Sequence, residues 1–154
     1  MTVLPDSSAI NMKKVLFVCT GNTCRSPIAE AIFNQLAEDK GFIASSCGTL
    51  GDGESRISNY AKAVLIEEGI DFDHISTPVT KDLIKEANYV VGMTSNHAMN
   101  LISMFPDNAD KIYAMPKDIT DPYGSNLDIY RKCKNEIAEC VKIIINTLEG
   151  NKND

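Results

Sequence analysis

The chain alternates between two hydrophobic patterns, short apolar runs and longer stretches in which apolar residues recur every three to four positions. Four apolar runs, rich in β-branched residues, predict buried strands at 14–18, 42–47, 89–93 and 111–114. The 3–4 spacing predicts helices at 27 to near 41, 58–68, 80–87, 95–105 and 125–150. This alternation indicates an α/β fold, a parallel sheet with helices on both faces whose ligands bind beyond the carboxyl ends of the strands.

Polar residues before each helical stretch provide its start signal. Ser26 followed by Pro27 is typical of an N-cap with a first-turn proline. The other predicted N-caps are Ser58, Thr80, Ser95 and Ser125, the last in a capping box with Asp128.

Length and composition indicate a single enzyme-sized domain rather than several domains. With 154 residues and 44% hydrophobic content, the chain can bury one core, which we place at 13–150. Residues 1–12 lack periodicity and are interpreted as a disordered or non-native extension, and 151–154 as a tail.

Charge, hydropathy and cysteine content argue against nucleic-acid binding, membrane association and a disulfide-bonded fold. The net charge of −6 argues against nucleic acid as a partner, because a basic face is missing. No membrane-length apolar stretch and no leader pattern are present, so we expect no membrane association and a cytoplasmic location. Five cysteines, an odd number, favour reduced thiols.

The loop between the first strand and the first helix carries the candidate chemistry. Cys19 ends the strand, Gly21 and Asn22 suit a tight turn, and Arg25 follows Cys19 by six positions. The helix N-terminus directs unpaired amides into this loop, and the arginine fork can hold two oxygens of one oxyanion. The same positive field is expected to depress the pKa of Cys19 and favour the attacking thiolate. The loop is therefore interpreted as a phosphate cradle with its own nucleophile.

A second loop, at 118–124, follows the fourth strand and contains Asp118 and Asp121. Pro122 and Gly124 predict a fixed turn that holds Asp121 in place. A nucleophilic phosphatase needs an acid to protonate the leaving atom, although Asp-Pro-x-Gly is also an ordinary turn before a helix.

Together the Cys19-Thr-Gly-Asn-Thr-Cys-Arg-Ser-Pro loop and the Asp121-Pro-Tyr-Gly turn resemble the low-molecular-weight protein tyrosine phosphatases, across residues 13–150. The resemblance implies a four-stranded, Rossmann-like three-layer fold with no metal and no organic cofactor. It implies Cys19 as nucleophile, Arg25 as phosphate clamp and Asp121 as general acid. The substrate would be a phosphorylated protein, hydrolysed through a phosphocysteine, with inorganic phosphate as product.

The resemblance also implies which residues form the phosphate-binding loop: Thr20, Gly21, Asn22, Thr23, Cys24 and Ser26. Asn22 and Ser26 would shape the loop and bond the thiolate, and Ser46 is matched to the same polar network.

Thr23 is the main clue to substrate choice. Many tyrosine-specific members of the family have a larger apolar residue there, whereas bacterial protein-arginine phosphatases are similar to this chain in having threonine. We therefore favour phosphoarginine, with phosphotyrosine as the alternative in which Thr23 is a neutral substitution. Tyr123, beside the acid, is expected either to line the pocket or to brace its loop.

The remaining cysteines and the histidines leave alternatives open. Cys24 either forms a reversible disulfide with Cys19 or packs as a small hydrophobe. Arsenate reductase is a remote alternative that would need redox cysteines, and Cys133 and Cys140 are explained instead by helix packing. A non-catalytic oxyanion-binding module is the non-enzyme alternative. The two histidines, His74 and His97, fit no metal-ligand spacing and are assigned to the surface or a supporting layer.

Overall fold

The computed structural model describes residues 12–152, and the interpretation of 1–12 as an extension falls almost entirely outside them. A four-stranded, all-parallel sheet has the order β2-β1-β3-β4. The strands are β1 (Lys13–Cys19), β2 (Phe42–Gly48), β3 (Tyr89–Gly92) and β4 (Ile112–Ala114). The helices are α2 (Arg25–Leu36), α3 (Asn59–Glu67), α4 (Lys81–Glu86), α5 (Ser95–Met104) and α6 (Leu127–Lys152), with a 3₁₀ helix η1 (Pro106–Lys111) before β4. The predicted fold class is confirmed.

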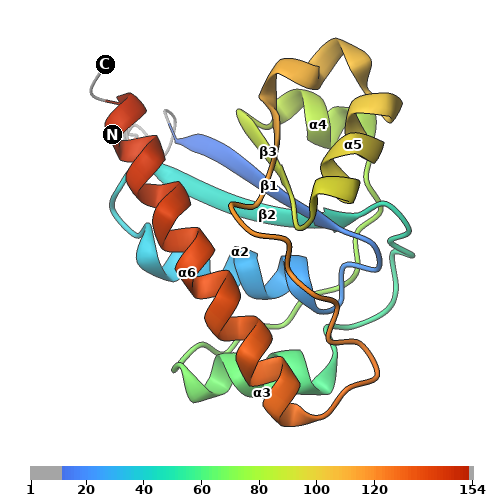
Figure 1. The fold of residues 1–154 in the computed structure, drawn as a ribbon, viewed down its shortest axis with the longest axis vertical. Coiled ribbons are helices and arrows are strands. Elements are labelled where there is room, and N and C mark those ends of the chain that lie inside the picture. The colour runs from blue at the N-terminus through green and yellow to red at the C-terminus, as the bar shows by residue number, and fades with distance from the viewer. Residues whose placement is uncertain (1–11, 153–154) are drawn as a thin grey trace, which may run out of the picture.

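Helices cover both faces of the sheet (Figure 1). Helices α2, α3 and α6 lie on one side, and α4 and α5 lie on the other. Strand β1 is central, and all of Val15–Cys19 is buried, because each face of this strand is covered. Its side chains alternate between two cores, with Val15 and Phe17 in the larger and Leu16 and Val18 in the smaller.

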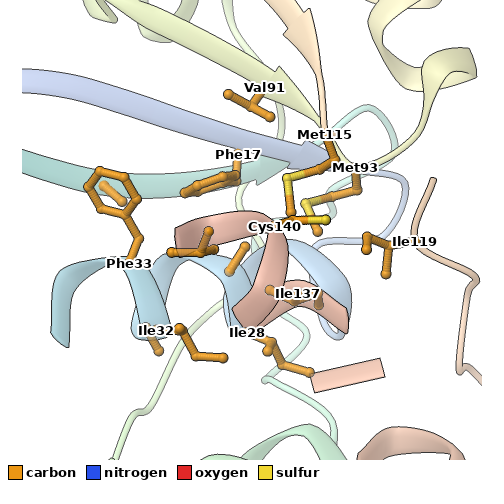
Figure 2. Packing of buried hydrophobic residues seen from close by; sticks show 14 of the residues in the cluster. Phe17, Ile28, Ile32, Phe33, Val91, Met93, Met115, Ile119, Ile137 and Cys140 are labelled. Carbon is orange, nitrogen blue, oxygen red and sulfur yellow. The ribbon is translucent and has the colours of Figure 1, made fainter. Parts of the chain in front are cut away.

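The larger core fixes the position of α2 beneath the sheet (Figure 2). Phe17 of β1 meets Phe33 of α2 edge to face, with ring centroids 5.8 Å apart. Ile28 of α2 and Ile137 of α6 are fully buried in the same cluster. Because α2 is held against β1 and α6, its N-terminus is fixed at the carboxyl end of β1.

Three predicted helix starts differ from the structure. Ser26 is not an N-cap, because α2 already begins at Arg25 and the Ser26 hydroxyl bonds to Cys19 Sγ instead. Thr94, not Ser95, caps α5 by accepting from the His97 backbone N–H. Asn126, not Ser125, accepts from Ile129 N at the start of α6. At α5 and α6 two neighbouring residues could each act as the cap, whereas α2 begins after Cys24 without a side-chain cap.

The predictions at Ser58 and Thr80 are confirmed, since each hydroxyl accepts a backbone N–H in the first turn of its helix. The last helix ends at Lys152 rather than at Gly150. The 3₁₀ helix before β4 was not predicted. Within residues 12–152, no helix is long and apolar enough to cross a membrane.

Candidate active site

The loop from Cys19 to Arg25 wraps around the end of β1, and Cys19 lies at its base. The Cys19 Sγ is 2.8 Å from Ser26 Oγ and accepts from the Asn22 backbone N–H at 3.3 Å. Asn22 adopts the left-handed conformation, with φ 58°, which turns this N–H inward. The thiol is therefore enclosed by hydrogen-bond donors from the first turn of α2 and from the loop.

The electrostatics of Cys19 differ from the sequence-based expectation. Burial raises the pKa of the Cys19 thiol, because a thiolate is poorly solvated at this depth. The hydroxyl of Ser26, the N–H of Asn22 and the charge of Arg25 lower the pKa but do not outweigh burial. The expected depression of the Cys19 pKa is thus wrong for this structure, although the groups that stabilise the thiolate are those predicted.

Asn22 connects the loop to a buried polar network. Its Nδ2 donates to Ser26 Oγ at 2.8 Å and to Ser46 Oγ at 3.0 Å. Its Oδ1 accepts from the Thr77 backbone N–H at 2.8 Å, and His74 Nε2 lies 2.7 Å from the same oxygen. Since Oδ1 is an acceptor, His74 carries its proton on Nε2. The structure brings Ser46 into the site's network.

A carboxyl group lies at the far end of this network. Ser46 Oγ donates to Glu30 Oε1 at 2.7 Å, and His74 Nδ1 is 3.9 Å from the same oxygen. Burial raises the pKa of Glu30 to about 7 and lowers that of His74. Both shifts favour the neutral forms, so the network holds Asn22 without placing a full charge beneath Cys19.

The loop after β4 places Asp121 over the phosphate loop. Asp121 Oδ2 is 3.6 Å from Arg25 Nη2, and a turn with Tyr123 and Gly124 at its centre follows it, closed by a bond from Ser125 N to the Pro122 carbonyl at 2.9 Å. Arg25 is almost completely buried, and its Nη1 donates to the Ile119 carbonyl at 2.9 Å. The Asp121 side chain is 54% exposed, which leaves it accessible to a leaving group.

One pocket of about 220 Å³ is lined by the predicted site residues of both loops except Ser26, which is buried behind Cys19. It is lined by Cys19, Thr20, Gly21, Asn22, Thr23, Cys24, Arg25, Asp121 and Tyr123. The Cys19 thiol, the loop, the Arg25 guanidinium and the Asp121 carboxyl group therefore line one pocket. In-line attack on a phosphoryl group with protonation of the leaving atom requires such an arrangement.

Asp118 has a different position from Asp121. Its Oδ1 accepts from the backbone N–H of Ser95 at 2.8 Å and from the hydroxyl of Ser95 at 3.0 Å. A carboxylate at the N-terminus of α5 interacts favourably with the helix dipole. Asp118 therefore anchors the loop to α5.

Thr23 and Cys24 both line the pocket, and Thr23 Oγ1 lies 3.8 Å from Cys24 Sγ. Thr23 is half-buried. The Cys24 Sγ also lies 3.3 Å from Tyr130 Oη and 3.4 Å from Ser58 Oγ, on the side of α3 and α6. Tyr123 is 78% exposed at the pocket entrance.

The histidines have supporting positions that sequence patterns could not specify. His74 bonds Asn22 from 52 positions away, and His97 Nε2 lies 2.9 Å from Thr20 Oγ1 across 77 positions. His97 is held in turn by Thr94, whose Oγ1 is 2.8 Å from Nδ1. Burial and the charge of Arg25 lower the pKa of His97. Glu30 was also missed, because it reads as a polar residue of an amphipathic helix.

The remote redox alternative, which needs reactive cysteines besides Cys19, finds little support in residues 12–152. No group of three metal-ligating side chains occurs there. Cys133 and Cys140 are both buried in α6, where burial raises the pKa of each thiol. These positions fit packing, as expected from their spacing.

Comparisons with known proteins agree with the motifs. The sequence model of the family "Low molecular weight phosphotyrosine protein phosphatase" matches residues 14–154. A protein-arginine-phosphatase of Bacillus subtilis is 33% identical over 147 residues, covering 90% of this chain and 98% of the relative. The YwlE arginine phosphatase structure from Geobacillus stearothermophilus has a TM-score of 0.87 at 33% identity, covering 91% of this chain and 95% of that one. The low molecular weight protein tyrosine phosphatase structure from T. tengcongensis has a TM-score of 0.84 at 37% identity, covering 88% and 99% respectively.

Proposed function

The chain belongs to the low molecular weight phosphotyrosine protein phosphatase family, and we propose that its Cys19 hydrolyses phosphorylated protein side chains. The observation that carries the proposal is the single pocket that holds Cys19, Arg25 and Asp121 together. A non-catalytic oxyanion-binding module would need the cradle and the arginine but would have no use for a carboxyl group 3.6 Å from that arginine.

The proposed reaction has two displacements at phosphorus. First, Cys19 attacks as the thiolate: its Sγ forms a bond to phosphorus while the bond to the leaving oxygen or nitrogen breaks, and Asp121 gives its proton to that atom. Loop amides and Arg25 hold the equatorial oxygens. Water then attacks the phosphocysteine, its proton passes to Asp121, and phosphate leaves as the thiolate is restored. Ser26 and Asn22 stabilise that thiolate as the leaving group.

For the side chain that carries the phosphate, we propose phosphoarginine, with phosphotyrosine as the second candidate. Thr23 lines the pocket, where its hydroxyl gives one wall a polar group suited to a guanidine leaving group. The similarity of relatives supports this choice: two curated arginine phosphatases, 33% and 34% identical, match 90% and 88% of this chain, whereas the tyrosine phosphatase PtpB of Staphylococcus haemolyticus, at 33% identity, matches 77%. A nucleophilic thiol and an odd number of cysteines also support a reducing, cytoplasmic setting.

Two substitutions test these proposals. Cys19→Ser should abolish turnover of phosphorylated peptides while the variant still binds phosphate, and near wild-type turnover would contradict the role of Cys19. Matched phosphoarginine and phosphotyrosine peptides should be compared with wild type and with Thr23→Ile. We expect wild type to prefer phosphoarginine and Thr23→Ile to shift the kcat/KM ratio toward phosphotyrosine. A wild-type preference for phosphotyrosine that Thr23→Ile leaves unchanged would reject the arginine proposal.

A further inference from the structure

A second hollow, much larger than the catalytic pocket, opens beside it along α5. It has a volume of about 730 Å³. Its lining residues, here called the α5 groove, are Thr20, Arg25, Thr49, Leu50, Thr94, Asn96, His97, Asn100, Ser103 and Met104. Thr20 and Arg25 also line the catalytic pocket, so the two hollows adjoin each other at these residues. None of the steps proposed above uses the rest of this groove.

The wall of the α5 groove is one face of one helix. Asn96, His97, Asn100, Ser103 and Met104 follow the i, i+3, i+4, i+7 spacing of a helix stripe. From Thr94 to Met104 the stripe extends about 15 Å, at about 1.5 Å per helical residue. An extended polypeptide rises about 3.3 Å per residue, so about four or five residues fit along the groove.

The lining has the chemistry of a peptide-binding surface. The side-chain amides of Asn96 and Asn100 are exposed and have no hydrogen-bond partner among residues 12–152, so both can pair with a peptide main chain. Leu50, on the loop after β2, is 75% exposed and forms an apolar rim together with Met104. Arg25 is the only charged residue of the lining, and it faces Asp121. The groove therefore suits an uncharged, extended segment.

We propose that the α5 groove binds the extended polypeptide that flanks the phosphorylated residue of the substrate. This inference rests on the proposed function, because the groove adjoins the pocket that would receive the phosphorylated side chain and shares Thr20 and Arg25 with it. It adds that recognition extends about four or five residues from that side chain, through main-chain hydrogen bonds to Asn96 and Asn100 and apolar contact with Leu50 and Met104. Flanking residues without charge would bind best.

Peptide length tests the proposal directly. A blocked single phosphorylated residue should be compared with the same residue flanked on each side by five uncharged residues, in phosphoarginine and phosphotyrosine series. We expect the longer peptide to have about tenfold higher kcat/KM, the equivalent of one or two net hydrogen bonds. Asn100→Ala and Leu50→Ser should each remove most of this gain and leave kcat/KM for p-nitrophenyl phosphate unchanged.

Matched controls are available on α6, which lies across the sheet from α5 (Figure 1). Asn135→Ala and Ile143→Ser make the same kinds of change at exposed positions and should preserve the length effect. Equal kcat/KM for short and long peptides in wild type would overturn the proposal. An equal loss of kcat/KM on p-nitrophenyl phosphate in Asn100→Ala and Leu50→Ser would also overturn it. A wild-type dimer that Leu50→Ser dissociates would overturn it too, because the groove would then lie between two copies of the chain. Failure of the wild type to hydrolyse even p-nitrophenyl phosphate would instead reject the proposed function, and the groove proposal with it.

Discussion

At the scale of single residues, the two carboxylates of the loop after β4 differ in what surrounds them. Asp118 accepts two hydrogen bonds from Ser95, whereas Asp121 is more than half exposed beside Arg25. Only Asp121 lines the pocket with Cys19. The sequence favoured Asp121 as the acid but left open whether Asp118 shares that role, because the answer depends on the contact between Asp118 and the start of α5.

Asp121→Asn should therefore impair protonation of the leaving group. We expect kcat to fall by about 10²–10⁴-fold on phenyl phosphate, whose leaving group needs a proton, and much less on p-nitrophenyl phosphate, whose leaving group does not. Steady-state kinetics on both esters measures the difference. Asp118→Asn is the matched control and should show no leaving-group dependence. An equal loss on both esters in Asp121→Asn would mean that Asp121 has another role.

The Cys24 thiol gives a second residue-scale prediction. Its contacts with Tyr130 and Ser58 must break before it can form a disulfide with Cys19. We predict that peroxide first oxidises Cys19, that Cys24 then displaces water from the sulfenic acid, and that dithiothreitol restores activity. In Cys24→Ser the recovery should be largely lost. Equal recovery in both proteins would favour packing as the only role of Cys24.

At the scale of elements, the sequence predicts the part of the Cys19–Arg25 loop whose residues are neighbours in the chain. It does not predict the hydrogen bonds that this loop makes with residues far away in the chain. Cys19, Asn22 and Arg25 lie within one strand-loop-helix unit, whose apolar run and turn residues are local signals. His74 lies outside this unit, and Glu30, although it belongs to α2, is connected to Asn22 only through Ser46 of β2. No spacing in the sequence indicates either connection. Ser26 shows the same limit, since its bond to Cys19 Sγ removes it from the cap position that its local sequence favours.

Glu30 of α2, whose carboxyl group accepts a hydrogen bond from Ser46 of β2, should make the stability of the fold depend on pH. The pKa of Glu30 is about 7 in the folded protein, against about 4.3 in an unfolded chain. Between these values the folded state binds more protons, so Glu30 destabilises the fold increasingly as the pH rises from about 4.3 to about 7. The free energy of unfolding of Glu30→Gln, taken relative to that of wild type, should therefore be higher at pH 8 than at pH 5, by at most about 3 kcal/mol.

Urea unfolding at both pH values measures this change. Glu38→Gln, at an exposed position just after α2, is the matched control and should show no such gain. His74 also faces Glu30, so His74→Asn with Glu30→Gln should reveal whether the two side chains titrate together. If the free energies of unfolding of Glu30→Gln and wild type differed by the same amount at pH 5 and at pH 8, Glu30 would not be a carboxyl group whose pKa is raised by burial.

At the scale of the whole molecule, the site exists only when the sheet is complete. The phosphate loop follows β1, Ser46 belongs to β2, and Asp121 follows β4 at the opposite edge of the sheet. Alternating patterns predicted the parallel sheet and hence the meeting of these segments at its carboxyl edge. Their separations could not be predicted, because they depend on how α2 and α6 pack in the larger core.

An anion that binds this assembled site should stabilise the whole fold. Binding to the folded state alone adds about 2.7 kcal/mol when the ligand is at 100 times its Kd. We therefore expect inorganic phosphate to raise Tm in wild type, and Arg25→Lys to lose most of the increase, because a lysine cannot hold two oxygens with a planar fork. Chloride at equal ionic strength controls for screening. An equal increase in Arg25→Lys, or with chloride, would show that phosphate acts through general charge effects, since specific binding requires the guanidinium that the core holds beside Asp121.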